Sequence, residues 1–261
     1  MTESTPVTAS RPVAIITGGA AGIGLAAVEV LAEAGMDVVA LDLPGVSFAE
    51  VEAIDSRVAG DVVAATGDVT IADDWASVVA MCRTRFGRID VLFNNAGIGG
   101  AISSLVDFPD DSFEQVMQIN VRGVYLGMKH VVPAMLEAGS GSIINNASIS
   151  GMQGSPRMIA YAASKHAVIG MTRSAAMEFA PNIRVNAVCP APTTTAMMAT
   201  LQTTLGIDDD ERFQEVFTAD TPFGRFAEAR EIAEVVAFLA GPQSSFMTGA
   251  VVPVDGGATA G

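Results

Sequence analysis

Short apolar runs alternate with longer amphipathic stretches along most of the chain. The apolar runs are typical of buried strands and fall at residues 13–16, 37–41, 62–66, 89–93, 142–147, 183–188 and 247–254. Helical patterns separate them, at about residues 23–34, 45–60, 71–86, 111–138, 161–179 and 228–239. Strands that alternate with helices in this way predict a parallel sheet with right-handed crossovers. We therefore expect an α/β fold with a mainly parallel, seven-stranded, doubly wound sheet flanked by helices on both faces.

Two segments and one proline depart from the regular alternation. Residues 1–12 are rich in Thr, Ser and Pro and lack the apolar stretch of a secretory signal, so we expect a disordered tail before a single domain at 13–261. Residues 197–223 carry Met and Thr without a clear period, which fits either a substrate lid or a surface helical excursion. Pro133 is expected to interrupt or kink the long helical stretch near its end.

The formal net charge is −15, from 14 Lys and Arg against 29 Asp and Glu. Nucleic acids and anionic membranes bind basic patches, so neither is expected as a partner. Half of the residues are hydrophobic, yet no apolar run approaches the roughly 20 residues of a membrane span. Cys82 and Cys189 lie far apart, which favours a reduced, cytoplasmic protein. The two histidines form no cluster with the cysteines, so no metal site is expected.

The turn after the first strand is rich in glycine, from Thr17 to Gly24. It joins a strand to a helix N-terminus, where free N–H groups and the helix dipole favour a pyrophosphate. Glycine lets the backbone approach phosphates without a side chain in the way. No Gly-Lys-Ser/Thr follows, so the turn is not a nucleoside-triphosphate loop.

An acidic residue, Asp42, ends the second strand about twenty residues after the glycines. Its carboxylate can accept hydrogen bonds from an adenosine ribose and would repel a 2′-phosphate. No Lys or Arg occurs between Pro12 and Ser56 to bind such a phosphate. These features predict NAD rather than NADP, although Asp42 alone is also typical of a turn. After the third strand, Asp68 is placed where a carboxylate could meet an adenine amino group.

Tyr161 and Lys165 lie one turn apart on the same side of a predicted helix. An ammonium so close to a phenol favours the phenolate, so we expect the pKa of Tyr161 to fall from about 10. A tyrosine of that kind can act as a general acid or base on an alcohol or a carbonyl. Ser148 follows the fifth strand, and its hydroxyl could polarise the same substrate oxygen. An ordinary amphipathic helix with a Tyr and a Lys on one face is the alternative interpretation.

Taken together, these motifs resemble the short-chain dehydrogenase/reductase family, over nearly the whole chain from about Val13 to Gly257. The shared motifs are Thr17-Gly18-x-x-x-Gly22-x-Gly24, Asp68-Val69, Asn94-Asn95-Ala96-Gly97, Arg184-Val185-Asn186, Pro190…Thr195 and Asp255-Gly256-Gly257. The resemblance implies a Rossmann-type domain with the catalytic tetrad Asn120, Ser148, Tyr161 and Lys165. It also implies cofactor contacts from Gly18, Ala21, Gly22, Ile23, Gly24, Asp42, Asp68, Val69, Asn94, Ala96, Gly97, Tyr161, Lys165, Pro190, Thr193 and Thr195.

The reaction that the resemblance implies is reversible hydride transfer between NAD and a secondary alcohol or ketone, with Tyr161 as general acid and base. Lys165 would also bind the nicotinamide ribose, and Asn120 would hold a water that relays protons. The substrate would contact Ser148, Ser150, Met152, Met158, Tyr161, Met197 and Met198. The methionines favour an aliphatic or alicyclic alcohol, although thioethers are also ordinary core filler.

Two other functions share parts of this pattern. An NADPH-dependent 3-oxoacyl thioester reductase would have the same fold and tetrad, and Asp42 argues against it. A non-catalytic NAD-binding protein would not need an intact tetrad. The family also implies a homotetramer, in which the helices of Asn120 and Tyr161 pack across one interface and the C-terminal strand lies near another.

The chain departs from the family pattern at two positions. Ala191 stands where the family usually has glycine, and it would be strained if the backbone there needs a positive φ. Asn146 stands where an apolar residue is common, two positions before Ser148. The sequence gives no reason for this asparagine.

Overall fold

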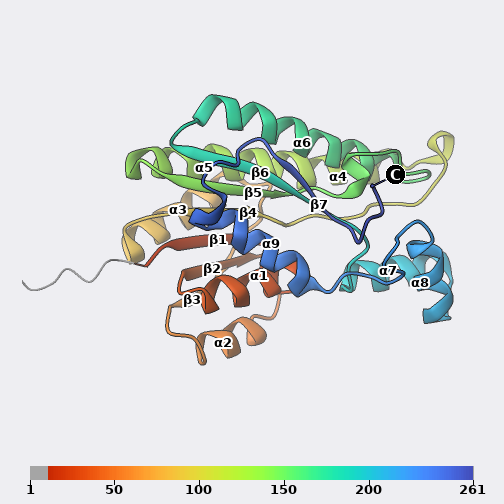
Figure 1. Ribbon diagram of the computed structural model, residues 1–261, viewed down its shortest axis with the longest axis horizontal. Helices are drawn as coiled ribbons and strands as arrows, with labels where there is room; N and C mark the ends of the chain where they lie inside the picture. Colours follow the sequence, from red (N-terminus) through yellow and green to blue (C-terminus); the bar gives the residue numbers. More distant parts are fainter. Residues whose placement is uncertain (1–10, 261) are drawn as a thin grey trace, which may run out of the picture.

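A computed structural model describes residues 11–260 of the chain (Figure 1). The tail predicted at residues 1–12 lies outside the described residues, except for Arg11 and Pro12. The carbonyl oxygen of Pro12 accepts a hydrogen bond of 2.9 Å from the N–H of Asp37. Within residues 11–260, no helix is both long enough and apolar enough to cross a membrane.

The centre of the molecule is a sheet in which every pairing is parallel. Its seven strands in the described part of the chain are β1 Val13–Thr17, β2 Asp37–Asp42, β3 Val62–Thr66, β4 Val91–Asn94, β5 Gly141–Asn146, β6 Ile183–Pro190 and β7 Val251–Val254. Their order is β3-β2-β1-β4-β5-β6-β7, which confirms the predicted doubly wound, seven-stranded sheet. The order reverses between β1 and β4, and ligands of such sheets bind at this point, beyond the carboxyl ends of the strands.

Helices cover both faces of the sheet, as Figure 1 shows. On one face, α1 Gly22–Glu33, α2 Ala49–Asp55 and α9 Ala229–Ala240 pack against the sheet. On the other face lie α3 Ala72–Phe86, α5 Gly123–Ala138 and α6 Ile159–Phe179. Because both faces are covered, the central strands are apolar throughout, and all five residues of β1 are buried.

The long helical stretch differs from the expectation. It consists of α4 Asp110–Met117, a π-helical turn at Gln118–Arg122, and α5. α5 continues through Pro133 to Ala138, so an interruption at this proline is wrong, whereas a kink there stays a prediction. Pro133 lies near the end of the helix, and its neighbours Val131 and Met135 are fully buried in the core, which holds the backbone in place. The irregular turn lies instead around Asn120, and such π turns are frequent at functional sites.

The last strand begins at Val251 rather than at Met247. The side chain of Asn186 on β6 contacts the segment that precedes this strand. It donates to the carbonyl oxygen of Met247 at 2.9 Å and accepts from the N–H of Ala250 at 3.0 Å. The segment before β7 is therefore attached to β6 by this side chain and also by backbone hydrogen bonds, including one of 2.7 Å from the N–H of Gly249 to the carbonyl oxygen of Val185.

The stretch predicted as a lid or a helical excursion contains two helices, α7 Ala196–Leu205 and α8 Asp210–Thr218. Figure 1 shows them together at one end of the molecule. No residue of α7 is buried, whereas α8 is anchored by Phe213, whose ring lies 4.7 Å from that of Phe217 and 5.8 Å from that of Phe226. The excursion is thus helical, and its role as a lid stays a prediction.

Candidate active site

The glycine-rich turn after β1 is attached to the end of β4. The Thr17 hydroxyl oxygen accepts hydrogen bonds of 2.9 Å from the N–H groups of Asn95 and Ala96. The Asn95 side chain in turn donates to the carbonyl oxygens of Thr17 at 2.9 Å and Gly18 at 3.3 Å. The turn therefore has a fixed position at the point where the strand order reverses.

The glycines of this turn are required by its shape. Gly18 and Gly22 have φ angles of +63° and +54°, in the left-handed region. A Cβ atom at Gly24 would lie 1.9 Å from the carbonyl oxygen of Gly18, so only glycine lets α1 start this close to the turn. A Cβ atom at Gly22 would lie 3.2 Å from the methyl group of Thr195, so any side chain would reduce the space between the turn and the loop after β6.

The start of α1 suits a phosphate group. Ala21 is its N-cap, and no side chain among the described residues caps the helix there. The first N–H groups of the helix lack partners within the helix, and the helix dipole adds positive potential at this end. A dinucleotide therefore fits the turn, with the N–H groups of Gly22 and Ile23 available to its pyrophosphate.

Asp42 lies at the end of β2, beside the same turn. One carboxylate oxygen accepts the N–H of Ala20 at 3.1 Å, and the other accepts the N–H of Leu43 at 2.8 Å. The residue thus shapes the turn, as its simpler interpretation proposed. Each carboxylate oxygen still has a free lone pair for a ribose hydroxyl.

Asp68 and Val69 follow β3 and are half-buried. The Asp68 carboxylate accepts the N–H of Thr70 at 2.8 Å, and the Asp68 N–H donates to Asp74 at 2.7 Å. Val69 packs against α5, since a Cβ atom added at Gly123 would lie 2.9 Å from its side chain. Both residues are therefore held in fixed positions at the end of β3, and their contact with an adenine stays a prediction.

Asn94 differs from the other predicted cofactor residues. Its side chain is buried and donates to the Asn145 side chain at 2.8 Å, between β4 and β5. A Cβ atom at Gly127 would lie 2.4 Å from its amide oxygen, so the side chain points toward α5. Its neighbours Ala96 and Gly97 continue along the edge toward Asn120.

The four residues of the predicted tetrad come from three elements. Asn120 lies on the π-helical turn, Ser148 follows β5, and Tyr161 and Lys165 are on α6. Asn120 is 1% exposed and exchanges two hydrogen bonds of 2.9 Å with the backbone of Ile98. It also donates to the Ser164 hydroxyl on α6 at 3.1 Å.

Lys165 is 5% exposed, and its Nζ donates to the main-chain oxygen of Asn146 at 2.7 Å. Burial lowers the pKa of Lys165 from 10.5 to about 8. Its Nζ also lies 5.5 Å from the centre of the Tyr161 ring. The ammonium is therefore close to the tyrosine and titrates near working pH.

The pKa of Tyr161 moves in the direction opposite to the expectation. Burial of the phenol raises it above 10.0, and this effect outweighs the hydrogen bond with Ser148, which lowers it. The expectation considered the charge of Lys165 alone and did not include loss of hydration, which depends on the tertiary structure. Tyr161 in this structure is a protonated phenol at neutral pH, hydrogen-bonded to Ser148.

The predicted substrate residues lie on two segments. Ser150 is in the 3₁₀ turn η3 Ile149–Gly151, and its N–H donates to the Ser148 hydroxyl at 3.1 Å. Met152 and Met158 follow it before α6, and Met197 and Met198 begin α7. Met152 and Met197 are about two-fifths exposed, at 40% and 43%, so neither is core filler.

Pro190 ends β6, and Thr193 and Thr195 belong to the loop that follows. Thr195 lies next to Gly22 of the glycine-rich turn. Ala191 within the loop donates its N–H to the carbonyl oxygen of Val254 at 3.2 Å. Among residues 11–260, Arg157 is the only non-glycine with a positive φ, so Ala191 adopts its conformation without strain. The alanine is therefore compatible with the loop shape.

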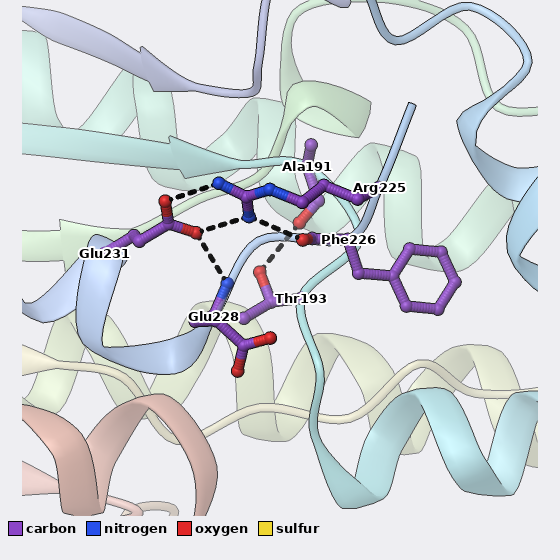
Figure 2. Close-up of polar contacts among 6 residues, drawn as sticks. All are labelled: Ala191, Thr193, Arg225, Phe226, Glu228 and Glu231. Carbon is purple, nitrogen blue, oxygen red and sulfur yellow. Dashed lines mark hydrogen bonds and ion pairs between the residues drawn. The ribbon is translucent and has the colours of Figure 1, made fainter. Parts of the chain in front are cut away.

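A second segment, which includes Arg225 and Phe226, lies beside this loop (Figure 2). The N–H of Thr194 donates to the carbonyl oxygen of Ala227, and the N–H of Ala227 donates to that of Pro192, both at 2.9 Å. Arg225 makes two hydrogen bonds of 2.8 Å to Glu231, which also accepts the N–H of Glu228 at 2.8 Å. These contacts lower the pKa of Glu231 to about 2, so it stays ionised.

The sequence interpretation missed this support for the loop. The available signal was the pair Glu228 and Glu231, whose spacing of three residues is that of a capping box at the start of α9.

In the described part of the chain, no group of three His, Cys, Asp or Glu residues is arranged to hold a metal ion.

Comparison with known proteins places this site in a family. The model of a family described as enoyl-(acyl carrier protein) reductase matches residues 18–259, which is nearly the whole chain. The chain belongs to the short-chain dehydrogenase/reductase family. Enzymes of this family bind a nicotinamide cofactor, and this member is an oxidoreductase that acts on CH–OH groups and the corresponding carbonyl groups.

Individual relatives of this short-chain dehydrogenase/reductase align with it over nearly the whole length of both chains. Levodione reductase of Leifsonia aquatica is 38% identical over 95% of this chain and 94% of its own. A crystal structure of levodione reductase superposes with a TM-score of 0.89 at 36% identity, over 95% of this chain and 98% of that one. Trans-4-hydroxycyclohexanecarboxylate dehydrogenase of Sinomonas cyclohexanicum is 42% identical over 97% of this chain and 94% of its own. A 3-oxoacyl-[acyl-carrier-protein] reductase of Thermotoga maritima is 38% identical over 94% of this chain and 96% of its own.

Proposed function

We propose that this enzyme interconverts an alicyclic secondary alcohol and its ketone with NAD, and that Tyr161 is the general acid and base. The observation that carries the proposal is the contact set of the tetrad. Tyr161 is hydrogen-bonded to Ser148, and the Lys165 ammonium lies 5.5 Å from the tyrosine ring. This set lies at the carboxyl edge of the sheet, next to a turn that fits a dinucleotide.

In the direction of oxidation, ionised Tyr161 takes the hydroxyl proton of the substrate. Ser148 donates a hydrogen bond to the substrate oxygen and holds it beside the phenol. The bound nicotinamide supplies the hydride acceptor for oxidation and the hydride donor for reduction. Because its pKa is about 8, Lys165 can return a proton to Tyr161 or receive one from it near working pH. Asn120, held against Ile98 and Ser164, fixes the far side of this proton path.

The preference for NAD rests on Asp42. A 2′-phosphate on the adenosine ribose would bring negative charge against this carboxylate. The first arginine after the turn, Arg57, is already paired with Glu29 at 2.9 Å. The region around the ribose site thus offers acceptors for hydroxyl groups and repels a phosphate.

The alicyclic substrate is supported by the relatives and by the exposed methionines. Two relatives are named for a cyclic dione and for a hydroxylated cyclohexane acid. Met152 and Met197 offer flexible apolar surface of the kind that accommodates a saturated ring. A homotetrameric assembly and a cytoplasmic location stay predictions.

The alternative reaction is NADPH-dependent reduction of a 3-oxoacyl thioester. The observation in its favour is the 38% identity with the Thermotoga maritima reductase. Asp42 opposes it, because that cofactor carries the 2′-phosphate. A non-catalytic NAD-binding role is opposed by the intact set of Asn120, Ser148, Tyr161 and Lys165.

The test is a side-by-side assay of NAD and NADP with cyclohexanols, aryl alcohols and 3-hydroxyacyl thioesters. We expect reduction of NAD with the cyclohexanols to exceed every other combination by at least about tenfold. Faster turnover of 3-hydroxyacyl thioesters with NADP would overturn the proposal in favour of the reductase. Tight NADH binding without turnover of any alcohol or ketone would favour the binding protein.

A further inference from the structure

Asn146 connects the catalytic lysine to the cofactor turn. It is the last residue of β5, two positions before Ser148. Its main-chain oxygen accepts the hydrogen bond of 2.7 Å from Lys165. Its side-chain Nδ2 donates to the Oδ1 of Asn95 at 2.9 Å, and Asn95 holds the glycine-rich turn. This asparagine, which the family pattern does not explain, thus contacts both halves of the site.

The surrounding hydrogen bonds fix which way the Asn146 amide faces. Asn95 uses its Nδ2 to donate to the carbonyl oxygens of Thr17 and Gly18. Asn95 can therefore offer only its oxygen to Asn146, so Asn146 must present its Nδ2 there. The Oδ1 of Asn146 consequently faces away from Asn95.

That oxygen is buried without a donor. In residues 11–260, it is the one buried side-chain nitrogen or oxygen that has no hydrogen-bond partner. A buried acceptor in this state is costly, and native structures nearly always satisfy such groups with protein, water or ligand. The position of Asn146 indicates which ligand group could supply the donor.

The order of groups along the cofactor indicates which of them could donate a hydrogen bond to the Oδ1 of Asn146. The pyrophosphate fits the turn at Gly18 and Gly22, and the hydride is exchanged beside Ser148 and Tyr161. In a nicotinamide dinucleotide, the group between the pyrophosphate and the nicotinamide ring is a ribose with two hydroxyl donors. Asn146 lies between the same two places, because its amide contacts Asn95 and its carbonyl contacts Lys165.

We propose that the Oδ1 of Asn146 accepts a hydrogen bond from a hydroxyl of the nicotinamide ribose. The proposal rests on the nicotinamide chemistry of the proposed function but not on the choice of alcohol. Asn146 then connects the glycine-rich turn, the ribose and Lys165, so the position of each depends on the other two. An apolar residue at this position would provide neither the acceptor nor the contact with Asn95.

The test compares ligands that differ by this ribose. ADP lacks it and ADP-ribose carries it, so calorimetric titration of both isolates the ribose contact. With Asn146→Leu, we expect affinity for ADP-ribose and for NADH to fall roughly three- to tenfold, as loss of one hydrogen bond implies. Affinity for ADP should stay within about twofold of wild type. Asn146→Ala serves as a second variant in case the leucine prevents folding.

Asn145→Val is the matched control. Asn145 and Asn94 each precede Asn146 and Asn95 by one residue, and their side chains form a similar amide pair. The hydrogen-bond partners of Asn145, however, lie in the core. This variant should lower the melting temperature and leave the ratio of the ADP-ribose and ADP affinities unchanged.

Two outcomes would overturn the inference. Equal losses for ADP and ADP-ribose would mean that Asn146 acts only through the turn, and unchanged affinities would mean that a water satisfies its oxygen. Failure of wild type to bind NADH would instead count against the proposed function, which keeps the two failures distinct.

Discussion

Asn120 and Ile98 exchange two hydrogen bonds of 2.9 Å, with the asparagine side chain acting as both donor and acceptor for one backbone unit. Gly97 lies against this pair, because a Cβ atom there would be 3.1 Å from the Asn120 oxygen and 3.7 Å from the Lys165 Nζ. The segment after β4 therefore runs between Asn120 and Lys165. Asn120 reaches this position because the helix opens into a π turn at Gln118–Arg122.

We expect Asn120→Ala to lower both stability and turnover. The change leaves the partly buried N–H and carbonyl of Ile98 without their partner, which costs about 1–3 kcal/mol of unfolding free energy. It also frees the segment beside Lys165, so kcat should fall by at least about tenfold. Urea denaturation and steady-state kinetics measure the two effects. Asn120→Asp keeps an acceptor for the Ile98 N–H and should recover part of the stability; equal loss in both variants would argue against this hydrogen-bond role.

Much of the fold could be predicted because strand and helix patterns are local properties of the sequence. The apolar runs of β1 and β2 and the glycines of the turn need no knowledge of distant residues. The π turn at Asn120 was not predictable, because the sequence 111–138 is periodic enough for one continuous helix. The contact between Asn146 and Asn95 joins residues 51 positions apart, so no local pattern indicates it.

The pKa of Tyr161 illustrates a second limit. The spacing to Lys165 predicts a charge effect, whereas the observed shift follows from burial, which only the packing around α6 determines. Tyr161, Lys165 and Ser148 could be proposed from their spacing and position, whereas Asn120 was predictable only through the family resemblance. In the structure, the elements that carry the tetrad converge at the carboxyl edge of the sheet.

Tyr161→Phe should abolish turnover, with a loss of at least about a thousandfold in kcat. The phenol oxygen is the proposed proton donor and acceptor, and phenylalanine keeps the ring that lies beside Lys165. NADH affinity, measured by fluorescence titration, should stay within about threefold of wild type. Turnover within tenfold of wild type would show that another group transfers the proton.

The pH profile of the reaction should reflect the raised pKa of Tyr161. Oxidation needs the phenolate, and the phenol stays protonated at neutral pH because its pKa lies above 10.0. The rate of alcohol oxidation should therefore rise about tenfold per pH unit between pH 7 and 9. Ketone reduction needs the protonated phenol and should not rise over this range. A flat oxidation profile, with hydride transfer shown to be rate-limiting by deuterated alcohol, would contradict the assignment.

The contribution of a buried thiol to stability should be lost in alkaline solution. Cys82 is fully buried in the core, and burial raises its pKa from 9.0 to about 12. The folded state then holds a proton that the unfolded state releases, so the contribution of Cys82 is complete below pH 9 and is lost as the pH rises from 9 toward 12. The loss amounts to about 2–3 kcal/mol at pH 11.

Cys82→Ala tests this prediction by urea denaturation between pH 8 and 11. The variant should be less stable at pH 8 because of the cavity, and its stability should then fall less steeply than that of wild type. Val78→Ala, at a buried position on the same helix, makes a similar cavity without removing a titrating group. Parallel pH profiles for wild type and Cys82→Ala would exclude the thiol as the cause. Cys189, with a pKa raised to about 11, accounts for part of the slope that remains.

Substitution of Asp42 should change the preference of the enzyme between NAD and NADP. Its carboxylate orients the turn through Ala20 and also places negative charge where a 2′-phosphate would lie. Asp42→Asn keeps an oxygen that can accept the Ala20 N–H but removes the charge, so the ratio of kcat/KM for NAD to that for NADP should fall roughly tenfold or more. Asp42→Ala removes both properties and should also weaken NAD binding through the turn. If Asp42→Asn leaves the ratio unchanged, the charge does not select the cofactor, and the thioester reductase regains support.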